Sequence, residues 1–326
     1  MNRGLLRFFC VAMGLLAFPQ RSPAPLIYTA GEGWRYEQVG ATGSWMKTRA
    51  KDQLDVAQAS FDQKDFGTAM KAARRTVTQW PFSDYAPQAQ YLLARCYEAK
   101  GQDEKAFKAY QKLIERYPKI DNYDDIITSQ FRIANRYLAG QWFKVWNYIP
   151  AFPSMDKTIK MYEQVIKNGP YSEVAPVAQM NIGTAHENRR IKDYPGAAKA
   201  YERAADRYSE QKVGVDALYK VGQAYTKQAK TAEYDQSIAA QAIATFTDFA
   251  TLHPEDARVP EALKHIDELK TEQARGSFEI ARYYDKHGRW RGALIYYNEV
   301  LLKDPNSPFA EAARLRIDTL KKREAP

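Results

Sequence analysis

Two stretches of this chain repeat one spacing of small, aromatic and proline residues. The interval from Ala94 to Pro118 is 24 residues, and the interval from Ala281 to Pro305 is the same. Within each stretch an aromatic residue, an alanine and a second aromatic stand 3, 12 and 16 positions after the first alanine. These are Tyr97, Ala106 and Tyr110, and then Tyr284, Ala293 and Tyr297. Because type and distance agree, both stretches are expected to form the same supersecondary unit.

This spacing is typical of the tetratricopeptide repeat (TPR), which is a pair of antiparallel helices. The small residue of the first helix allows the second helix to approach closely, and the terminal proline ends the second helix. The same positions place about six units between Met46 and Pro305, and the segment after Pro305 is expected to be a charged capping helix. We predict an all-α, TPR-like solenoid with a right-handed superhelix, five to six repeats and a C-terminal cap.

The repeats are expected to fall into two groups. Residues 46–170 are predicted to hold the N-terminal repeats, and residues 171–326 the C-terminal repeats with the cap. Between the fifth and sixth repeats the sequence keeps a helical period with Gly276 as its single breaker. One long helix leading directly into the last repeat is therefore expected.

The first 45 residues do not have the repeat pattern. Residues 1–24 combine Arg3 and Arg7 with an apolar stretch and small residues near Ala24, which indicates a secretory signal peptide. Residues 25–45 are rich in glycine and aromatic residues, so an extended leader is expected, lying on the solenoid, on a partner, or free. Cys10 lies in the signal and only Cys96 follows it, so the mature chain has no internal disulfide.

The charge and motif content argue against several functional classes. The formal net charge is +9, and the positive residues are scattered along the sequence, which does not favour nucleic-acid binding. His186-Glu187 opens like a zinc-protease motif, but Arg190 stands in place of the second histidine. No phosphate-binding loop or nucleophile elbow is present in the sequence. We expect a non-enzymatic protein without cofactor, metal or small-molecule substrate.

The third repeat contains an aromatic insertion at residues 138–155. Ala134 is followed by the next repeat position, Thr158, after 24 residues, twice the interval of a regular unit. The insertion is so apolar that it is expected either to fold back on the solenoid or to contact another molecule. Folding back is favoured, while binding through Trp142 and Trp146 and contact with a bilayer surface remain alternatives.

First-helix positions on either side of the small residue are expected to line the inner wall of the solenoid. Three positions before it the side chains are mostly large and apolar, and one position after it they can form hydrogen bonds. An extended peptide bound there would insert side chains between these rungs and pair its carboxylate with an arginine. Ordinary packing between helices is the alternative. The candidate protein-binding residues of this wall are Tyr91, Arg95, Phe131, Asn135, Tyr219, Phe278 and Arg282.

The chain resembles the BamD (ComL) family of outer-membrane protein assembly factors. The resemblance rests on the export signal, on the repeats, and on the segments ARYYDKHGRWRGALIYYNEVLLKDPNSPFAEAA and WPFSDYAPQAQYLLARCYEAKGQDEKAFKAYQKLIERYP. It extends over roughly residues 46–322. In contrast to the lipoproteins of this family, Phe8 and Phe9 precede Cys10 where small residues are required for lipid attachment.

The resemblance implies a periplasmic scaffold at the inner face of the outer membrane. Its implied partners are the periplasmic domains of the barrel-forming assembly subunit and unfolded β-barrel substrates. By position, Tyr91 and Arg95 are implied to contact the substrate, and Arg282, Trp290 and Tyr296 to dock the assembly subunit. The alternative function is a periplasmic TPR adaptor that coordinates envelope constriction or peptidoglycan synthesis.

Overall fold

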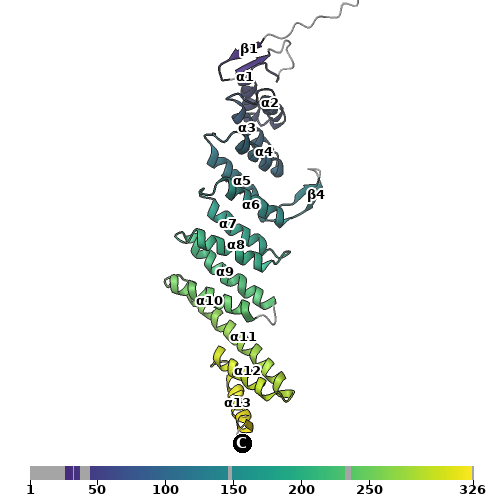
Figure 1. Ribbon diagram of the computed structural model, residues 1–326. Helices are drawn as coiled ribbons and strands as arrows, with labels where there is room; N and C mark the ends of the chain where they lie inside the picture. The colour runs from purple at the N-terminus through teal and green to yellow at the C-terminus, as the bar shows by residue number, and fades with distance from the viewer. Residues whose placement is uncertain (1–25, 32, 37–44, 146–148, 232–235, 325–326) are drawn as a thin grey trace, which may run out of the picture. The chain divides into compact units, whose positions relative to one another are not determined.

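The computed structural model describes residues 26–31, 33–36, 45–145, 149–231 and 236–324 (Figure 1). The chain divides into two compact units, residues 1–101 and 102–326, and each is described by itself. The predicted signal peptide, residues 1–24, lies outside the described residues, as does Trp146.

The described residues of the first unit form a short β-hairpin and three helices. The helices are α1 (Ala50–Asp62), α2 (Phe66–Gln79) and α3 (Ala86–Ala99). The hairpin pairs β1 (Leu26–Thr29) with β2 (Gly33–Tyr36) in antiparallel register within the predicted leader. Its turn rests on the α2–α3 turn, because the backbone N–H of Asp84 donates to the carbonyl of Gly31 at 2.8 Å. Gly31 has φ +77°, a conformation that favours glycine.

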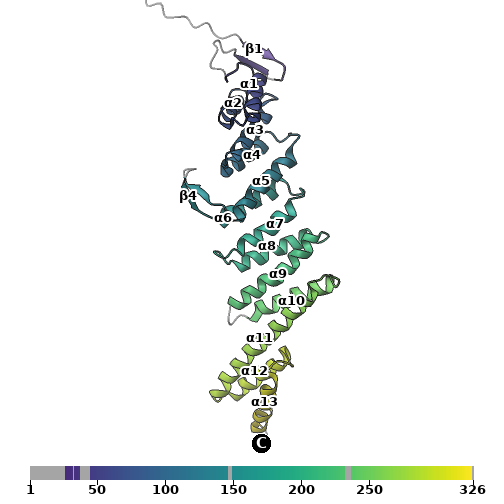
Figure 2. The same ribbon diagram turned by 180° about the vertical axis from the view of Figure 1, so that it is seen from behind.

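The second unit is a series of helices in which each helix packs on the next one in sequence. Outside the insertion between α5 and α6, the described residues of its repeats form antiparallel helical hairpins joined by short turns (Figures 1 and 2). The prediction of an all-α, TPR-like solenoid is confirmed. The helices are α4 (Asp103–Arg116), α5 (Tyr123–Leu138), α6 (Met155–Asn168), α7 (Ala175–His186), α8 (Tyr194–Arg207), α9 (Lys212–Thr231), α10 (Gln236–Leu252), α11 (Val259–Lys286), α12 (Trp290–Lys303) and α13 (Ala310–Glu324).

The small residue of the first helix in a repeat determines how closely the second helix can approach it. A methyl group added at Gly183 of α7 would lie 2.3 Å from the Tyr201 ring of α8. At Gly222 of α9 it would lie 2.7 Å from the Phe246 ring of α10. Both rings are fully buried. The aromatic ring therefore occupies the volume that a side chain on the first helix would need.

The long helix expected before the last repeat is present as α11, which continues through Gly276. Its first half, with Ala262 and Ile266, belongs to the apolar cluster of α9 and α10. Its second half, with Ala274 and Ala281, belongs to the cluster of α12 and α13. The segment after Pro305 forms α13, which covers the last hairpin as a capping helix does.

The aromatic insertion contains a second β-hairpin, which the sequence did not predict. β3 (Phe143–Val145) pairs antiparallel with β4 (Ile149–Phe152) between α5 and α6, with an irregular register at Phe143 and Lys144. Within the described part of the chain, no helix is both long enough and apolar enough to cross a membrane.

We predict that Gly183→Ala lowers the free energy of unfolding by about 1–3 kcal/mol, because the new methyl group displaces the Tyr201 ring. Thermal unfolding followed by circular dichroism measures the change. The control is Gly276→Ala in α11, where the added methyl group lies 3.3 Å from the Gln236 side-chain amide and helix propensity improves. Equal stability of the Gly183 variant and the parent would contradict this account of the packing.

Candidate protein-binding surfaces

In the first unit, Tyr91 and Arg95 form one aromatic and cationic cluster on α3. The exposed Arg95 guanidinium lies 4.9 Å from the centre of the Phe61 ring and 5.9 Å from that of Tyr91. Tyr91 itself is half-buried. A guanidinium held against ring faces retains exposed N–H donors for a carboxylate or a carbonyl. This pair can therefore hold both an apolar side chain and an acceptor group.

Asn135 takes part in a hydrogen-bond network within the protein. Its side-chain oxygen accepts from the Tyr162 hydroxyl at 2.5 Å and from the Asn181 amide at 3.0 Å. Burial raises the pKa of Tyr162, which stays a neutral donor. Phe131 lies nearby on α5, with its ring centre 6.0 Å from that of Tyr162. These contacts assign Asn135 a role in joining α5, α6 and α7.

Tyr219 belongs to the core of the second unit. Its side chain is 4 % exposed, and its ring centre lies 5.7 Å from Phe246 and 5.2 Å from Phe249. The Arg258 guanidinium covers the ring at 5.0 Å. Burial is the main cause that raises the pKa of Tyr219 to about 12. The inner-wall position predicted for Tyr219 is therefore covered by neighbouring side chains in the structure.

The insertion hairpin is fixed at its root and exposes a tryptophan beside it. Phe143 is buried and stacks on Tyr137 of α5 with 4.1 Å between ring centres, and the Lys157 ammonium lies 4.8 Å from its ring centre. Trp142, directly before it, is 49 % exposed. The insertion thus folds back through Phe143, while Trp142 remains accessible to another molecule.

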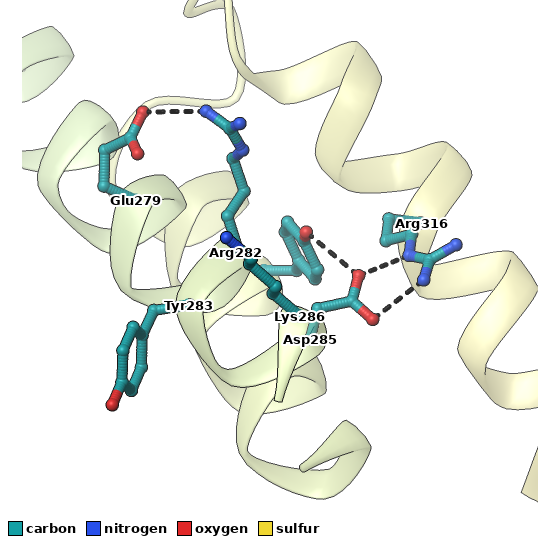
Figure 3. Close-up of a pocket in the computed structure, with 7 residues that line it drawn as sticks. Glu279, Arg282, Tyr283, Asp285, Lys286 and Arg316 are labelled. Atoms are coloured by element: carbon teal, nitrogen blue, oxygen red, sulfur yellow. Dashed lines mark hydrogen bonds and ion pairs between the residues drawn. The ribbon is translucent and has the colours of Figure 1, made fainter. Parts of the chain in front are cut away.

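Arg282, one of the C-terminal candidates, lines an open hollow of about 470 Å³ formed by α11, α12 and α13 (Figure 3). Asp285 forms an ion pair with Arg316 of α13 and accepts from the Tyr297 hydroxyl of α12 at 3.3 Å. The Asp285 carboxylate is the main cause that raises the pKa of Arg316. Because these groups satisfy one another, the ion pair attaches the cap to the last hairpin.

Arg282 faces solvent at the rim of the same hollow. Its guanidinium lies 3.4 Å from the Glu279 carboxylate, and both side chains are more than half exposed. Such a surface pair contributes little to stability, so a ligand or partner can replace it. Tyr283, 60 % exposed, points away from the Asp285–Arg316 pair (Figure 3). Arg282 is therefore an accessible cation beside an accessible aromatic ring.

The other C-terminal candidates take part in packing within the protein. Tyr296 is half-buried and stacks on Tyr284, with 5.5 Å between the ring centres. Phe278 lies against Tyr297 and Phe309, at 5.7 and 5.5 Å between ring centres. Trp290 is half-buried in the same apolar cluster. These three side chains shape the surface of the last hairpin and are only partly accessible.

Sequence reasoning missed two exposed apolar residues on α12. Ile295 is 66 % exposed and Leu302 is 84 % exposed. Seven residues apart, they lie on one face of the helix, opposite the buried Ala293, Tyr297 and Val300. The signal was present in the sequence, because WRGALIYYNEVLLK has apolar residues on all sides and a helix covered on one side needs only one apolar stripe.

The described residues contain no group of three His, Cys, Asp or Glu side chains arranged to hold a metal ion. The Cys96 thiol is buried, and burial raises its pKa to about 11, so it remains a protonated packing group at neutral pH.

Two family models match segments of the chain that hold the Tyr91–Arg95 cluster and the C-terminal helices. A TPR model matches residues 88–119, which include Tyr91 and Arg95. The model of the YfiO family, described as outer membrane lipoprotein, matches residues 153–323, which include α11, α12 and α13 and make up more than half of the chain. The chain belongs to the YfiO family. TPR and YfiO proteins are generally non-catalytic scaffolds for protein interactions, and this chain is accordingly a TPR-type interaction scaffold.

Solved TPR structures resemble the chain at low identity. A TPR repeat protein from Bacteroides fragilis is 13% identical, with 85% of this chain and 100% of that chain covered and a TM-score of 0.40. The C-terminal part of a TPR protein from Cytophaga hutchinsonii is 14% identical, with 81% and 87% covered and a TM-score of 0.36. Among curated proteins, none matches the sequence significantly.

We predict that Tyr162→Phe lowers the free energy of unfolding by about 1–2 kcal/mol, because the Asn135 and Asn181 side chains lose the buried hydroxyl that joins them. Thermal unfolding measures the change. Tyr171→Phe removes the same atom from a side chain that is 96 % exposed and serves as the control. Equal melting temperatures for the two variants would show that the hydroxyl network is not stabilising.

Proposed function

We propose that the protein is a periplasmic scaffold of the machinery that inserts β-barrels into the outer membrane. The observation that carries the proposal is the YfiO family match over residues 153–323. It includes every C-terminal element predicted to dock the barrel-forming subunit. The fold supports the proposal, because stacked helical hairpins present extended surfaces suited to other polypeptides.

The last hairpin is the proposed docking side for the periplasmic domains of the barrel-forming subunit. Ile295 and Leu302 offer large apolar side chains to a partner, and Arg282 offers a cation at the rim of the neighbouring hollow. Exposed apolar side chains with polar neighbours are typical of protein–protein interfaces. Trp290 and Tyr296 support this surface from beneath through their contacts in the hairpin.

The first unit is the proposed contact for unfolded barrel segments. Such segments alternate apolar and polar side chains. The rings of Tyr91 and Phe61 suit an apolar side chain, and the Arg95 guanidinium suits a carbonyl or carboxylate of the same segment. By this proposal the chain is located in the periplasm, at the inner face of the outer membrane.

Recovery of partners from detergent-solubilised envelopes tests the docking side. We predict that the tagged chain recovers a large β-barrel protein, identified by mass spectrometry, and that Leu302→Glu lowers this recovery at least about tenfold, as expected for a central apolar contact. Leu252→Glu is the matched control, since Leu252 is a 66 % exposed leucine near the end of the second helix of the preceding repeat. It is expected to leave recovery unchanged.

Two results would contradict the proposed function. The first is recovery of peptidoglycan synthases or constriction proteins without a β-barrel protein, which would favour the TPR adaptor function. The second is equal recovery with the Leu302 and Leu252 variants, which would remove α12 from the docking surface. Mass spectrometry of the mature N-terminus in the same sample determines where the export signal is cleaved.

A further inference from the structure

The turns of the second unit lie alternately at two edges, because successive helices are antiparallel. The turns within repeats, α7–α8 and α11–α12, and the insertion between α5 and α6 share one edge. This edge is at the right in Figure 1 and at the left in Figure 2. The turns between repeats lie at the other edge. The charges of the two edges differ.

Six exposed cations stand at the edge with the turns within repeats, which we term the basic edge. Three belong to the α7–α8 turn and three surround the α11–α12 turn. The six residues are Arg189, Arg190, Lys192, Lys286, Arg289 and Arg291. At the other edge charges of both signs are exposed, with Asp121, Glu173, Glu210 and Glu255 beside Lys119 and Lys212.

The acidic residues next to these cations are engaged by groups of the protein. Glu187 accepts from the Tyr201 hydroxyl at 3.1 Å and pairs with Lys227 at 2.9 Å. Asp193 accepts from the backbone N–H of Gly196, which caps α8, and contacts His186 at 2.9 Å. Asp285 is paired with Arg316. Glu187 and Asp285 are thus paired with cations of the protein and Asp193 caps a helix, whereas Asp156 at the start of α6 is exposed, as the six cations are.

The basic edge also has an aromatic contact. Trp142 is 49 % exposed at the root of the insertion hairpin, and the buried Phe143 fixes that root to α5. Tryptophan prefers the boundary between headgroups and hydrocarbon, and Lys and Arg near it are attracted to anionic lipids. Glu233 and Asp235, between α9 and α10, lie outside the described residues.

We propose that the basic edge of the second unit binds the surface of an anionic phospholipid bilayer. Exposed cations in two turns of one edge match an extended negative plane, because both groups can contact the plane together. Trp142 supplies the apolar contact. The attraction between these cations and the anionic headgroups is electrostatic. It therefore decreases as added salt screens the charges. The α7–α8 turn belongs to another repeat than the apolar face of α12 proposed for docking a protein, whereas the α11–α12 turn adjoins that face, because Lys286 lines the hollow beside Arg282 and Arg291 lies one turn before Ile295.

Vesicle co-sedimentation of the full chain tests this site. We predict binding to vesicles of phosphatidylglycerol with phosphatidylcholine, no binding to phosphatidylcholine alone, and release by added salt. The variant R189E/R190E/K192E is expected to lower the affinity at least about tenfold, and K286E/R289E/R291E by a similar factor. Trp142→Ala is expected to weaken binding with the salt dependence retained.

The control variant K119E/K167E/K212E changes the net charge by the same amount with three exposed lysines of the other edge. It is expected to change the affinity less than about twofold, since these lysines do not face the bilayer. Equal losses from the two edges would overturn the proposal, because binding would then follow net charge alone. Absence of binding to the anionic vesicles, with circular dichroism showing folded protein, would also overturn it and would favour an acidic protein as the partner. The α7–α8 variant R189E/R190E/K192E is expected to leave the pull-down of the barrel protein unchanged, which keeps this test distinct from that of the proposed function.

Discussion

The close approach of the two helices in each hairpin is the constraint on which the solenoid depends. Gly183 and Gly222 leave room on the first helix, and Tyr201 and Phe246 fill that room from the second. Removing these rings from water stabilises the hairpin, since aromatic side chains bury the largest apolar areas. Because each hairpin is closed by its own pair, the binding surfaces are formed by the residues left outside the pairs.

Repeat spacing was sufficient to predict the hairpins, the long helix through Gly276 and the cap, because each depends on local periodicity. Repeat spacing was insufficient to predict which candidate side chains are covered by residues from elsewhere in the chain. Tyr219 has the position of an inner-wall residue, yet Phe249 and Arg258 from later elements cover it. Asn135 has the chemistry of a ligand-binding residue, but Tyr162 and Asn181 occupy its oxygen. The strands of the insertion also escaped prediction, because their place depends on Phe143 packing against Tyr137.

The distribution of charge is the clearest case in which the sequence and the structure lead to different conclusions. Along the sequence the positive residues are scattered, and acids such as Glu187 and Asp193 stand beside them. In the folded chain those acids are bound by Lys227, Tyr201 and the start of α8. The remaining exposed cations in the α7–α8 and α11–α12 turns then gather at one edge. A count of charges along the sequence cannot separate an acid that caps a helix from one that faces solvent.

The continuity of α11 gives the last two repeats a mechanical connection. Its 28 residues enter the apolar clusters of both the fifth repeat and the last hairpin. An α-helix is stiff over this length, so a tilt imposed on α12 and α13 by a bound molecule moves α11 as a rod. The displacement then reaches α9 and α10, on which the other end of the rod is packed. The C-terminal repeats would thus move together when a bound molecule tilts the last hairpin.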